Sequence, residues 1–331
     1  MRVLVTGGAG YIGSHVVRQL LAAGHEPVVY DNLSTGFAWA VGEAPLVRAD
    51  LADTAQLAET LARHAFDAVL HFAAHTVVPE SLSDPLRYYG NNTRNTWQLL
   101  QACHEAGVKR FVFSSTAAVY GMPETMPVAE DAPLAPINPY GASKMMSERM
   151  LMDLGAASDL RYVCLRYFNV AGAEPSGRLG QATPQATHLI KVACEAAVGR
   201  RDGVTVFGTD YATPDGTCVR DFIHVEDLAR AHIQALSHLV DGGDSQVLNC
   251  GYGRGYSVLE VLEAVKRLSG ADFPVTLGTR RAGDPAQVVA DNRRILRTLD
   301  WSPRYADLDT IVAHALAWER DGLLARRGPR R

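Results

Sequence analysis

A glycine-rich turn between a short apolar run and an amphipathic stretch constrains the fold of this chain most strongly. Residues 3–6 have the composition of a buried strand, and residues 12–23 have helical periodicity and end before Gly24. The glycines between them permit a tight turn and let the backbone approach a pyrophosphate at the helix N-terminus. This strand, turn and helix predict a dinucleotide site that includes Gly7, Gly10, Tyr11, Ile12 and Gly13.

The same alternation of strands and helices continues through the first half of the chain. We expect strands over residues 27–31, 68–74, 110–115 and 161–168, and helices over 54–64, over 92–106 and from Pro139 onward. Continuous apolar strands between helices predict an α/β fold, a doubly wound parallel sheet of the Rossmann type.

Past residue 170 glycine and proline become frequent, which indicates a second, smaller unit of mixed α/β structure. We expect a dinucleotide-binding domain over residues 1–170 and a smaller substrate-binding domain over 171–331. A helix over residues 225–239 and a strand over 246–251 predict that part of the second half, about residues 219–251, returns to the first sheet.

Asp31 ends the second expected strand at the spacing typical of the acid that binds the adenosine ribose. A carboxylate there accepts hydrogen bonds from a free 2′-hydroxyl and repels a 2′-phosphate, and the following residues 32–36 contain no arginine. The sequence therefore predicts NAD rather than NADP as the cofactor.

Composition excludes several other classes of protein. The net charge of −4 provides no general attraction for nucleic acid or for an anionic membrane, and no apolar run approaches transmembrane length. Five cysteines stand singly, the histidines lack metal-ligand spacing, and no Ser/His/Asp arrangement is recognisable. We therefore expect no metal site. Because an expected strand, not a signal peptide, follows Met1, we expect a cytoplasmic protein.

A catalytic pair is predicted at Tyr140 and Lys144, four residues apart on the helix that Asn138 and Pro139 begin. Removing hydride from an alcohol carbon needs a base for the hydroxyl proton, and an unperturbed tyrosine is too weak a base at neutral pH. A lysine ammonium about 5 Å away favours phenolate by roughly 3 kcal/mol at an effective dielectric of about 20. The nearby strand ends in Ser114, Ser115 and Thr116, where a doubly wound fold binds its ligands.

These motifs, the glycine turn, the Ser/Thr strand end and Tyr-x-x-x-Lys, resemble those of the extended short-chain dehydrogenase/reductase family. Residues 165–169, 219–225 and 280–284 are similar to the members of that family that act as UDP-hexose 4-epimerases. The resemblance extends from Met1 to about Trp318. It implies a homodimeric enzyme that interconverts UDP-glucose and UDP-galactose by reversible hydride transfer at sugar carbon 4, through a 4-keto sugar.

The resemblance also implies roles for individual residues, with Thr116, Tyr140 and Lys144 as the catalytic group. The cofactor would further contact Asp31, Asn32, Asp50, Leu51, Phe72, Ala73, Ala74, Asn91, Ser114 and Phe168. The UDP-sugar would contact Thr116, Asn169, His188, Leu189, Thr205, Phe207, Arg220, Arg281, Asp284 and Val288.

Three positions depart from the family pattern. Thr76 stands where a lysine often contacts the cofactor, and His188 stands where an asparagine often precedes Leu189. Val288 replaces a bulky tyrosine, which leaves room for an N-acetylated sugar. The sequence therefore leaves open a 4-epimerase of a UDP-N-acetylhexosamine, UDP-pentose or UDP-glucuronate, or a non-catalytic sensor of NAD or UDP-sugar.

Overall fold

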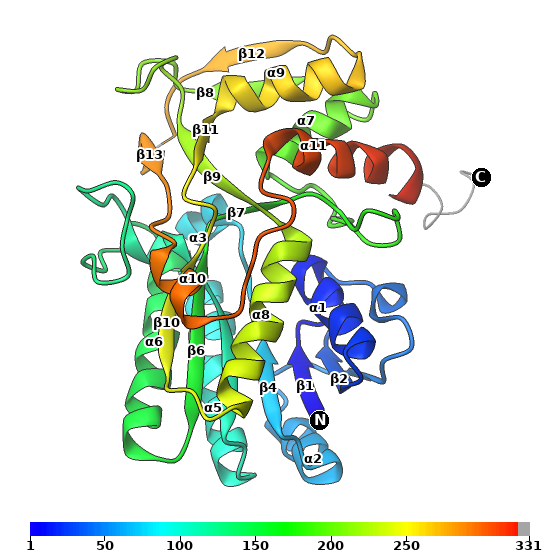
Figure 1. Cartoon of the computed structure of the whole chain (residues 1–331), viewed down its shortest axis with the longest axis vertical. Coiled ribbons are helices and arrows are strands. Elements are labelled where there is room, and N and C mark those ends of the chain that lie inside the picture. Colours follow the sequence, from blue (N-terminus) through cyan, green and yellow to red (C-terminus); the bar gives the residue numbers. More distant parts are fainter. Residues whose placement is uncertain (282, 324–331) are drawn as a thin grey trace.

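A seven-stranded parallel sheet forms the centre of the computed structural model, which describes residues 1–281 and 283–323 (Figure 1). The strand order is β10-β6-β5-β4-β1-β2-β3, and every neighbouring pair is parallel. This arrangement confirms the predicted doubly wound sheet. The strands are β1 (Arg2–Thr6), β2 (Glu26–Asp31), β3 (Leu46–Arg48), β4 (Ala68–His71), β5 (Arg110–Thr116), β6 (Arg161–Tyr167) and β10 (Gln246–Cys250).

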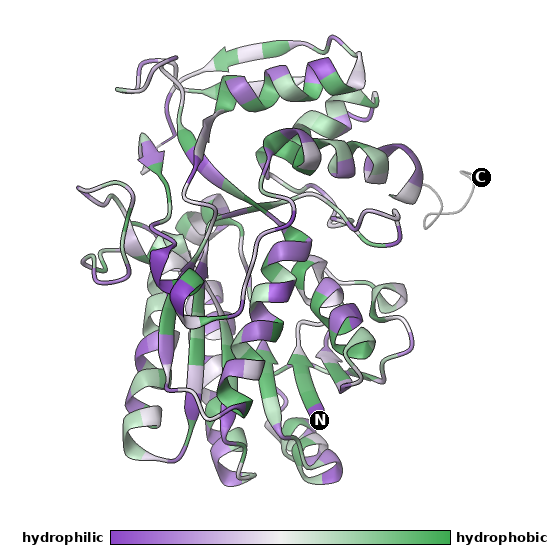
Figure 2. Ribbon diagram, in the orientation of Figure 1, coloured by the Kyte–Doolittle hydropathy of each residue, from purple (hydrophilic) through white to green (hydrophobic). Residues whose placement is uncertain are grey.

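Helices cover both faces of this sheet because the strands are apolar on both faces. Along β1, Val3 and Val5 belong to the core on the side of α1 and α8, whereas Leu4 belongs to the core on the side of α2, α5 and α6. Figure 2 shows β1 and β4 mostly in green, while α1 and α9 (Val258–Ser269) alternate between green and purple. The helices on the sheet are α1 (Tyr11–Ala22), α2 (Thr54–His64), α5 (Asn95–Glu105), α6 (Pro139–Ala157) and α8 (Val225–Val240).

A second group of elements lies beyond the carboxyl edge of the large sheet (Figure 1). Strands β7, β11 and β13 pair with β9, and β8 pairs with β12. The apolar faces of α7, α9 and α11 pack together against these strands. The group contains β7 (Asn169–Ala171), α7 (Leu189–Ala197), β8 (Val204–Phe207), β9 (Val219–His224), β11 (Gly255–Ser257), α9 (Val258–Ser269), β12 (Val275–Gly278), β13 (Gln287–Val288) and α11 (Leu308–Ala317).

Short helical segments connect these elements. Among the residues described, no helix is both long and apolar enough to span a membrane. The short segments are Ala38–Val41 and Ala117–Tyr120 (3-10), α3 (Val78–Ser83), α4 (Pro85–Tyr88), Tyr89–Arg94 and Trp318–Gly322 (π), and α10 (Arg293–Thr298).

Three expectations about local structure differ from the structure. The strand expected over 68–74 ends at His71, where the backbone leaves the sheet and Phe72 and Ala73 pack against Gly7. The helix expected over 92–106 begins with the π turn at Tyr89–Arg94. Strand β3 was not expected, since this three-residue edge strand is only half-buried and carries little apolar signal.

Candidate active site

The glycine turn brings the first strand, the first helix and the loop after β4 into backbone contact. Gly7 has a φ of 71°, and a Cβ atom there would lie 2.5 Å from the backbone nitrogen of Ala73. A Cβ atom on Gly13 would collide with the backbone oxygen of Gly7. Gly10 occupies the N-cap of α1 and has no side chain to cover the N-terminus of that helix. The three glycines therefore leave the backbone N–H groups at the N-terminus of α1 uncovered, which suits the binding of a pyrophosphate.

Asp31 ties the end of β2 to this turn. Its carboxylate is buried and accepts hydrogen bonds from the backbone N–H groups of Ala9 (3.0 Å) and Leu33 (2.8 Å). Burial raises the pKa of Asp31 above its ordinary value, although the two N–H groups act in the opposite direction. The acid expected at the ribose therefore lies beside the turn expected at the pyrophosphate.

Most other predicted cofactor residues lie along the same carboxyl edge of the sheet. Asn32 donates to the carboxylate of Asp50 at 2.7 Å, and the backbone N–H of Phe72 donates to Thr6 at 2.9 Å. Asn91 lies in the π turn and donates to Asn92 at 3.0 Å. The hydroxyl of Tyr11 donates to the backbone oxygen of Gly172 at 2.6 Å. The others are Ile12 at the start of α1, Leu51 in the core, Ala73 and Ala74 after β4, Ser114 on β5 and Phe168 after β6.

The predicted catalytic group is buried where α6 crosses the ends of β5 and β6. The side chain of Asn138 accepts a hydrogen bond from the N–H of Gly141, so α6 begins as predicted and places Tyr140 and Lys144 on one face. Lys144 donates to the backbone oxygen of Ser114 at 2.9 Å, and its nitrogen lies 4.7 Å from the ring centre of Phe113.

The titration of this pair differs from the sequence-based expectation. Burial lowers the pKa of Lys144 to about 7, while nearby Glu148 and Cys164 act in the opposite direction. Burial raises the pKa of Tyr140 above its ordinary value, with a further increase from Tyr167, and a hydrogen bond with Thr116 opposes this. The expected fall in the pKa of Tyr140 is therefore wrong for the chain alone, because a low dielectric disfavours both the phenolate and the ammonium.

The predicted substrate residues form two clusters. In the first, Arg220 on β9 pairs with Asp284, and the guanidinium of Arg281 lies 3.7 Å from the ring centre of Phe207 on β8. Val288 on β13 is the strand partner of Arg220. The members are Thr205, Phe207, Arg220, Arg281, Asp284 and Val288, with Asn169 on β7, which also pairs with β9.

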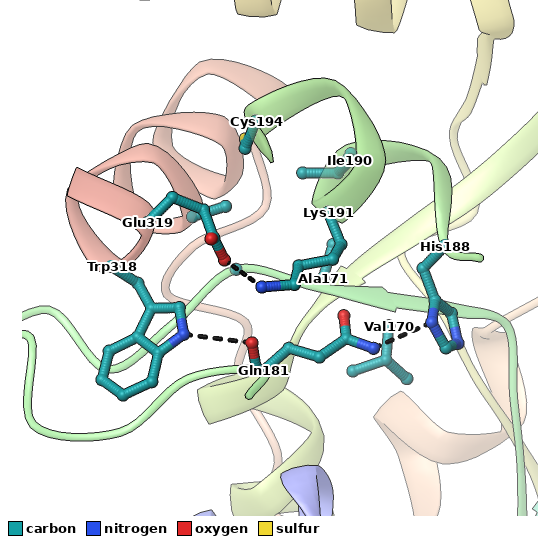
Figure 3. Close-up of a pocket in the computed structure, with 11 residues that line it drawn as sticks. Val170, Ala171, Gln181, His188, Ile190, Lys191, Cys194, Trp318 and Glu319 are labelled. Carbon is teal, nitrogen blue, oxygen red and sulfur yellow. Dashed lines mark hydrogen bonds and ion pairs between the residues drawn. The ribbon is translucent and has the colours of Figure 1, made fainter. Parts of the chain in front are cut away.

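The second cluster lies at the start of α7, where Leu189 is the first helical residue. Figure 3 shows the surroundings of His188, which precedes it. His188 keeps exposed surface, but neighbouring groups shield its imidazole from water and so lower its pKa. Gln181 lies 2.8 Å from its Nδ1 atom. The indole of Trp318 donates to the backbone oxygen of Gln181 at 3.1 Å, while Lys191 pairs with Glu319. The C-terminal π segment therefore holds the N-terminus of α7 in place.

Sequence reasoning missed two charged residues beneath the catalytic pair. Glu148 on α6 and Arg166 on β6 are buried and joined by an ion pair of 2.7 Å. One signal was available, because Glu148 follows Lys144 by one helical turn and therefore shares its buried face. Arg166 lies within an apolar strand, and nothing in the sequence indicates its partner.

The chain is similar to known epimerases over nearly its whole length. A model of the NAD dependent epimerase/dehydratase family matches residues 3–251. A UDP-glucose 4-epimerase of Azospirillum brasilense is 59% identical over 320 residues, which cover 96% of this chain and 92% of that protein. The crystal structure of UDP-glucose 4-epimerase from Brucella ovis in complex with NAD is 48% identical, with a TM-score of 0.93, covering 95% of this chain and 97% of that one. The UDP-Glc/GlcNAc 4-epimerase from Campylobacter jejuni is 50% identical, with a TM-score of 0.85, covering 96% and 99%.

The chain therefore belongs to the NAD dependent epimerase/dehydratase family. It is an isomerase with NAD as its cofactor. The glycine turn and Asp31 fit that cofactor, since a side chain at Gly7 or Gly13 would collide with the backbone.

Proposed function

We propose that this enzyme interconverts UDP-glucose and UDP-galactose by inverting the configuration at carbon 4 of the sugar. The observation that carries the proposal is the buried pair of Tyr140 and Lys144, held beside Thr116 at the same carboxyl edge of the sheet as the glycine turn. The likeness to proteins named UDP-glucose 4-epimerase over nearly the whole chain supports the same choice of substrate.

Tyr140 is the proposed acceptor of the 4-hydroxyl proton. Its hydroxyl is buried and hydrogen-bonded with Thr116, which orients the oxygen toward the sugar hydroxyl. When bound, NAD supplies the hydride acceptor and donor and a positive charge beside the phenol. Lys144, anchored on the backbone of Ser114, contributes a second positive charge that favours loss of the tyrosine proton.

The diphosphate and uracil are proposed to lie between β8 and β9. Arg220 and Arg281 present guanidinium groups, whose planar forks match phosphate oxygens in pairs. Arg220 is oriented by Asp284, and Arg281 by stacking on Phe207, so both groups are positioned in advance. Asn169, Thr205, His188 and Leu189 complete the proposed contacts.

The strand end near the sugar favours simple return of the hydride over elimination. Residues 117–119, which follow Thr116, read Ala-Ala-Val and contain no carboxylate to serve as an additional acid or base. These three residues therefore offer a 4-keto sugar no base for proton abstraction at a neighbouring carbon. This absence favours epimerisation over dehydration.

Incubating the purified, NAD-containing protein with UDP-galactose and assaying UDP-glucose tests the proposal. We expect conversion in both directions, approaching one equilibrium ratio. A protein that binds NAD and converts none of a panel of UDP-sugars contradicts it.

A second candidate is an epimerase with a wider range of UDP-sugars. Val288 leaves space where a larger residue would contact the 2-substituent, and the similar Campylobacter jejuni protein is named a UDP-Glc/GlcNAc 4-epimerase. Competition among UDP-glucose, UDP-N-acetylglucosamine, UDP-xylose and UDP-glucuronate separates these possibilities. The substrate with the highest kcat/KM identifies the preferred sugar.

We also propose a homodimer in the cytoplasm. Large apolar side chains are exposed on α3, α4, α5 and α6, namely Leu82, Leu86, Trp97 and Met146, and burying them against a second copy explains their exposure. All five cysteines are free and buried, which suits a reducing compartment. Sedimentation that shows only monomer contradicts the dimer.

The division of the chain into a cofactor domain and a substrate domain is likewise proposed. Residues 1–170 carry the glycine turn and the catalytic pair, and residues 171–331 carry most of the proposed UDP contacts. Residues 219–251 belong to both, since β10 pairs with β6 while β9 pairs with β7.

A further inference from the structure

Glu148 is a buried carboxylate one helical turn beyond Lys144 on the inner face of α6. Its side chain is 1% exposed, and the proposed reaction assigns it no role. Burying a carboxylate is costly unless charges and hydrogen bonds compensate for lost water. An apolar residue would fill the same space at lower cost, so the position of this charge calls for an explanation.

The carboxylate is held from two neighbouring strands. The guanidinium of Arg166 on β6 donates to both of its oxygens, with distances of 2.7 to 3.2 Å, and the hydroxyl of Ser115 on β5 donates to one of them. Ser115 and Arg166 are directly paired across the two parallel strands. The carboxylate therefore has a fixed position relative to both strands.

Arg166 is itself fully engaged, so it cannot turn away from Glu148. Its remaining donors reach the hydroxyl of Tyr120 at 3.0 Å and the backbone oxygen of Glu130 at 3.1 Å. Tyr120 in turn donates to the side chain of Asn249 on β10 at 2.6 Å. This network joins α6, β5, β6 and β10 beneath the catalytic pair.

Two consecutive residues of β5 anchor two residues one turn apart on α6. The backbone oxygen of Ser114 holds Lys144, and the hydroxyl of Ser115 holds Glu148. The ammonium and the carboxylate therefore keep a constant separation, since both are fixed to the same strand. We propose that Glu148 is a positioning residue that keeps Lys144 charged and correctly placed beneath Tyr140, an inference that rests on the proposed function of that pair.

The other titratable groups around Lys144 do not provide this negative charge. Burial keeps the thiol of Cys164 on β6 and the phenol of Tyr167 protonated, because it raises the pKa of each. The imidazole of His71 on β4 is neutral, since burial lowers its pKa far below the ordinary value. The phenol of Tyr88 on α4 is also neutral, because burial raises its pKa. Among the described residues, Glu148 contributes most to opposing the effect of burial on the pKa of Lys144.

The experiment compares wild type with Glu148→Gln, using Glu148→Asp as the charge-preserving control. Two quantities are measured on NAD-containing protein, the ultraviolet absorbance of the Tyr140 phenolate against pH and the pH profile of kcat. The Tyr140→Phe variant identifies the contribution of Tyr140 to the absorbance. For Glu148→Gln we expect the alkaline limb of kcat to move to lower pH by about one unit, because Lys144 loses its proton earlier, and phenolate to appear at higher pH. Glu148→Asp should retain most of the wild-type profile.

A purely structural role gives a different result. In that case Glu148→Gln lowers kcat by one factor at every pH and leaves the phenolate titration unchanged, which overturns the proposal. The phenolate titration is repeated in a Lys144→Met background, where we expect Glu148→Gln to have no further effect. An equal effect in both backgrounds also overturns it.

A second variant and the phenolate titration cover the cases in which Glu148→Gln does not fold or wild type is inactive. If Glu148→Gln does not fold, Ser115→Ala removes one anchor of the carboxylate without changing any charge, and we expect a smaller shift in the same direction. An unchanged titration in a folded Ser115→Ala protein then counts against the proposal. If wild type converts no UDP-sugar, the proposed function fails, whereas the phenolate titration still tests the coupling of Glu148 to Lys144.

Discussion

The ammonium group of Lys144 donates a hydrogen bond to the backbone oxygen of Ser114, with a nitrogen–oxygen distance of 2.9 Å. This contact fixes the amine to the strand that also ends in Thr116, the hydrogen-bond partner of Tyr140. The end of β5 therefore fixes the position of three groups: the proposed proton acceptor Tyr140, the hydroxyl of Thr116 and the ammonium of Lys144. A side chain as flexible as lysine gains a single position in this way.

Replacing Tyr140 with phenylalanine should abolish most of the epimerase activity while NAD remains bound. The hydroxyl group is the only part removed, and general-base catalysis by a positioned group contributes roughly 10² to 10⁴ in rate. We therefore expect kcat to fall by about 10³-fold. Steady-state assays with UDP-galactose and spectrophotometric measurement of the NAD released on denaturation check both parts.

The matched control is Tyr162→Phe, the same chemical change near the amino end of β6. This variant should keep near-normal kcat. A Tyr140→Phe protein that turns over normally contradicts the assignment of Tyr140 as the proton acceptor. Ligand binding without turnover in wild type favours the alternative of a non-catalytic sensor of NAD or UDP-sugar.

Apart from the edge strand β3, the strands of the large sheet were predictable because they are buried and read as apolar runs bounded by helix signals. Asn138 and Pro139 likewise marked the start of α6 correctly, since capping is decided by neighbouring residues. The end of β4 was not predictable, because residues 72–74 continue the apolar run although the backbone leaves the sheet after His71.

The candidate site was predictable only where local motifs carry the chemistry. The glycine turn and the Tyr-x-x-x-Lys spacing are such motifs, and the structure brings them to one edge of the sheet. The pairing of Glu148 with Arg166, and of Lys191 with Glu319, joins residues 18 and 128 positions apart, so no local pattern reveals them. The pKa of Tyr140 depends on the degree of burial, which spacing does not report.

Glu226 should make the stability of the fold depend on acid pH. Burial raises the pKa of its carboxyl, but the hydrogen bond and charge of His15, with the charge of Arg18, outweigh burial and lower the pKa to about 2. The unfolded chain, with an ordinary glutamate, binds more protons between about pH 2 and pH 4.5. The stabilisation is therefore complete above about pH 4.5 and is lost as the pH falls toward 2.

We expect Glu226→Gln to lower the free energy of unfolding at neutral pH by on the order of 3 kcal/mol. The difference from wild type should shrink as the pH falls through this window. Urea unfolding at several pH values measures it, with the exposed Glu43→Gln as the control. A difference independent of pH excludes this electrostatic origin.

Glu319→Gln should weaken both folding and substrate binding. The side chain of Glu319 is 1% exposed and pairs with Lys191 on α7 and with Arg200 at 2.6 Å, so a neutral replacement leaves two largely buried cations underpaired. We expect a loss of about 3 kcal/mol in unfolding free energy. We also expect a severalfold rise in KM with little change in kcat, because α7 carries His188 and Leu189.

The control for Glu319 is Asp272→Asn, which removes the exposed partner of Lys266. An exposed ion pair contributes about 0 to 1 kcal/mol, so stability and KM should both stay near wild type. A fall in kcat at unchanged KM for Glu319→Gln excludes a role through α7.

Val288→Tyr should select against N-acetylated sugars. Val288 is half-buried on β13 and packs against the apolar cluster that contains Phe168, so a tyrosine ring extends into the space assigned to the sugar. One misplaced group in a pocket changes discrimination by about 1 to 3 kcal/mol. We expect kcat/KM for UDP-N-acetylglucosamine to fall at least about tenfold, while the value for UDP-glucose stays within about threefold. Val288→Thr keeps the volume of the side chain and should leave the ratio of the two substrates unchanged. Equal losses on both substrates for Val288→Tyr place the new ring against a part of the ligand common to both, and they contradict the assignment of Val288 to the 2-substituent.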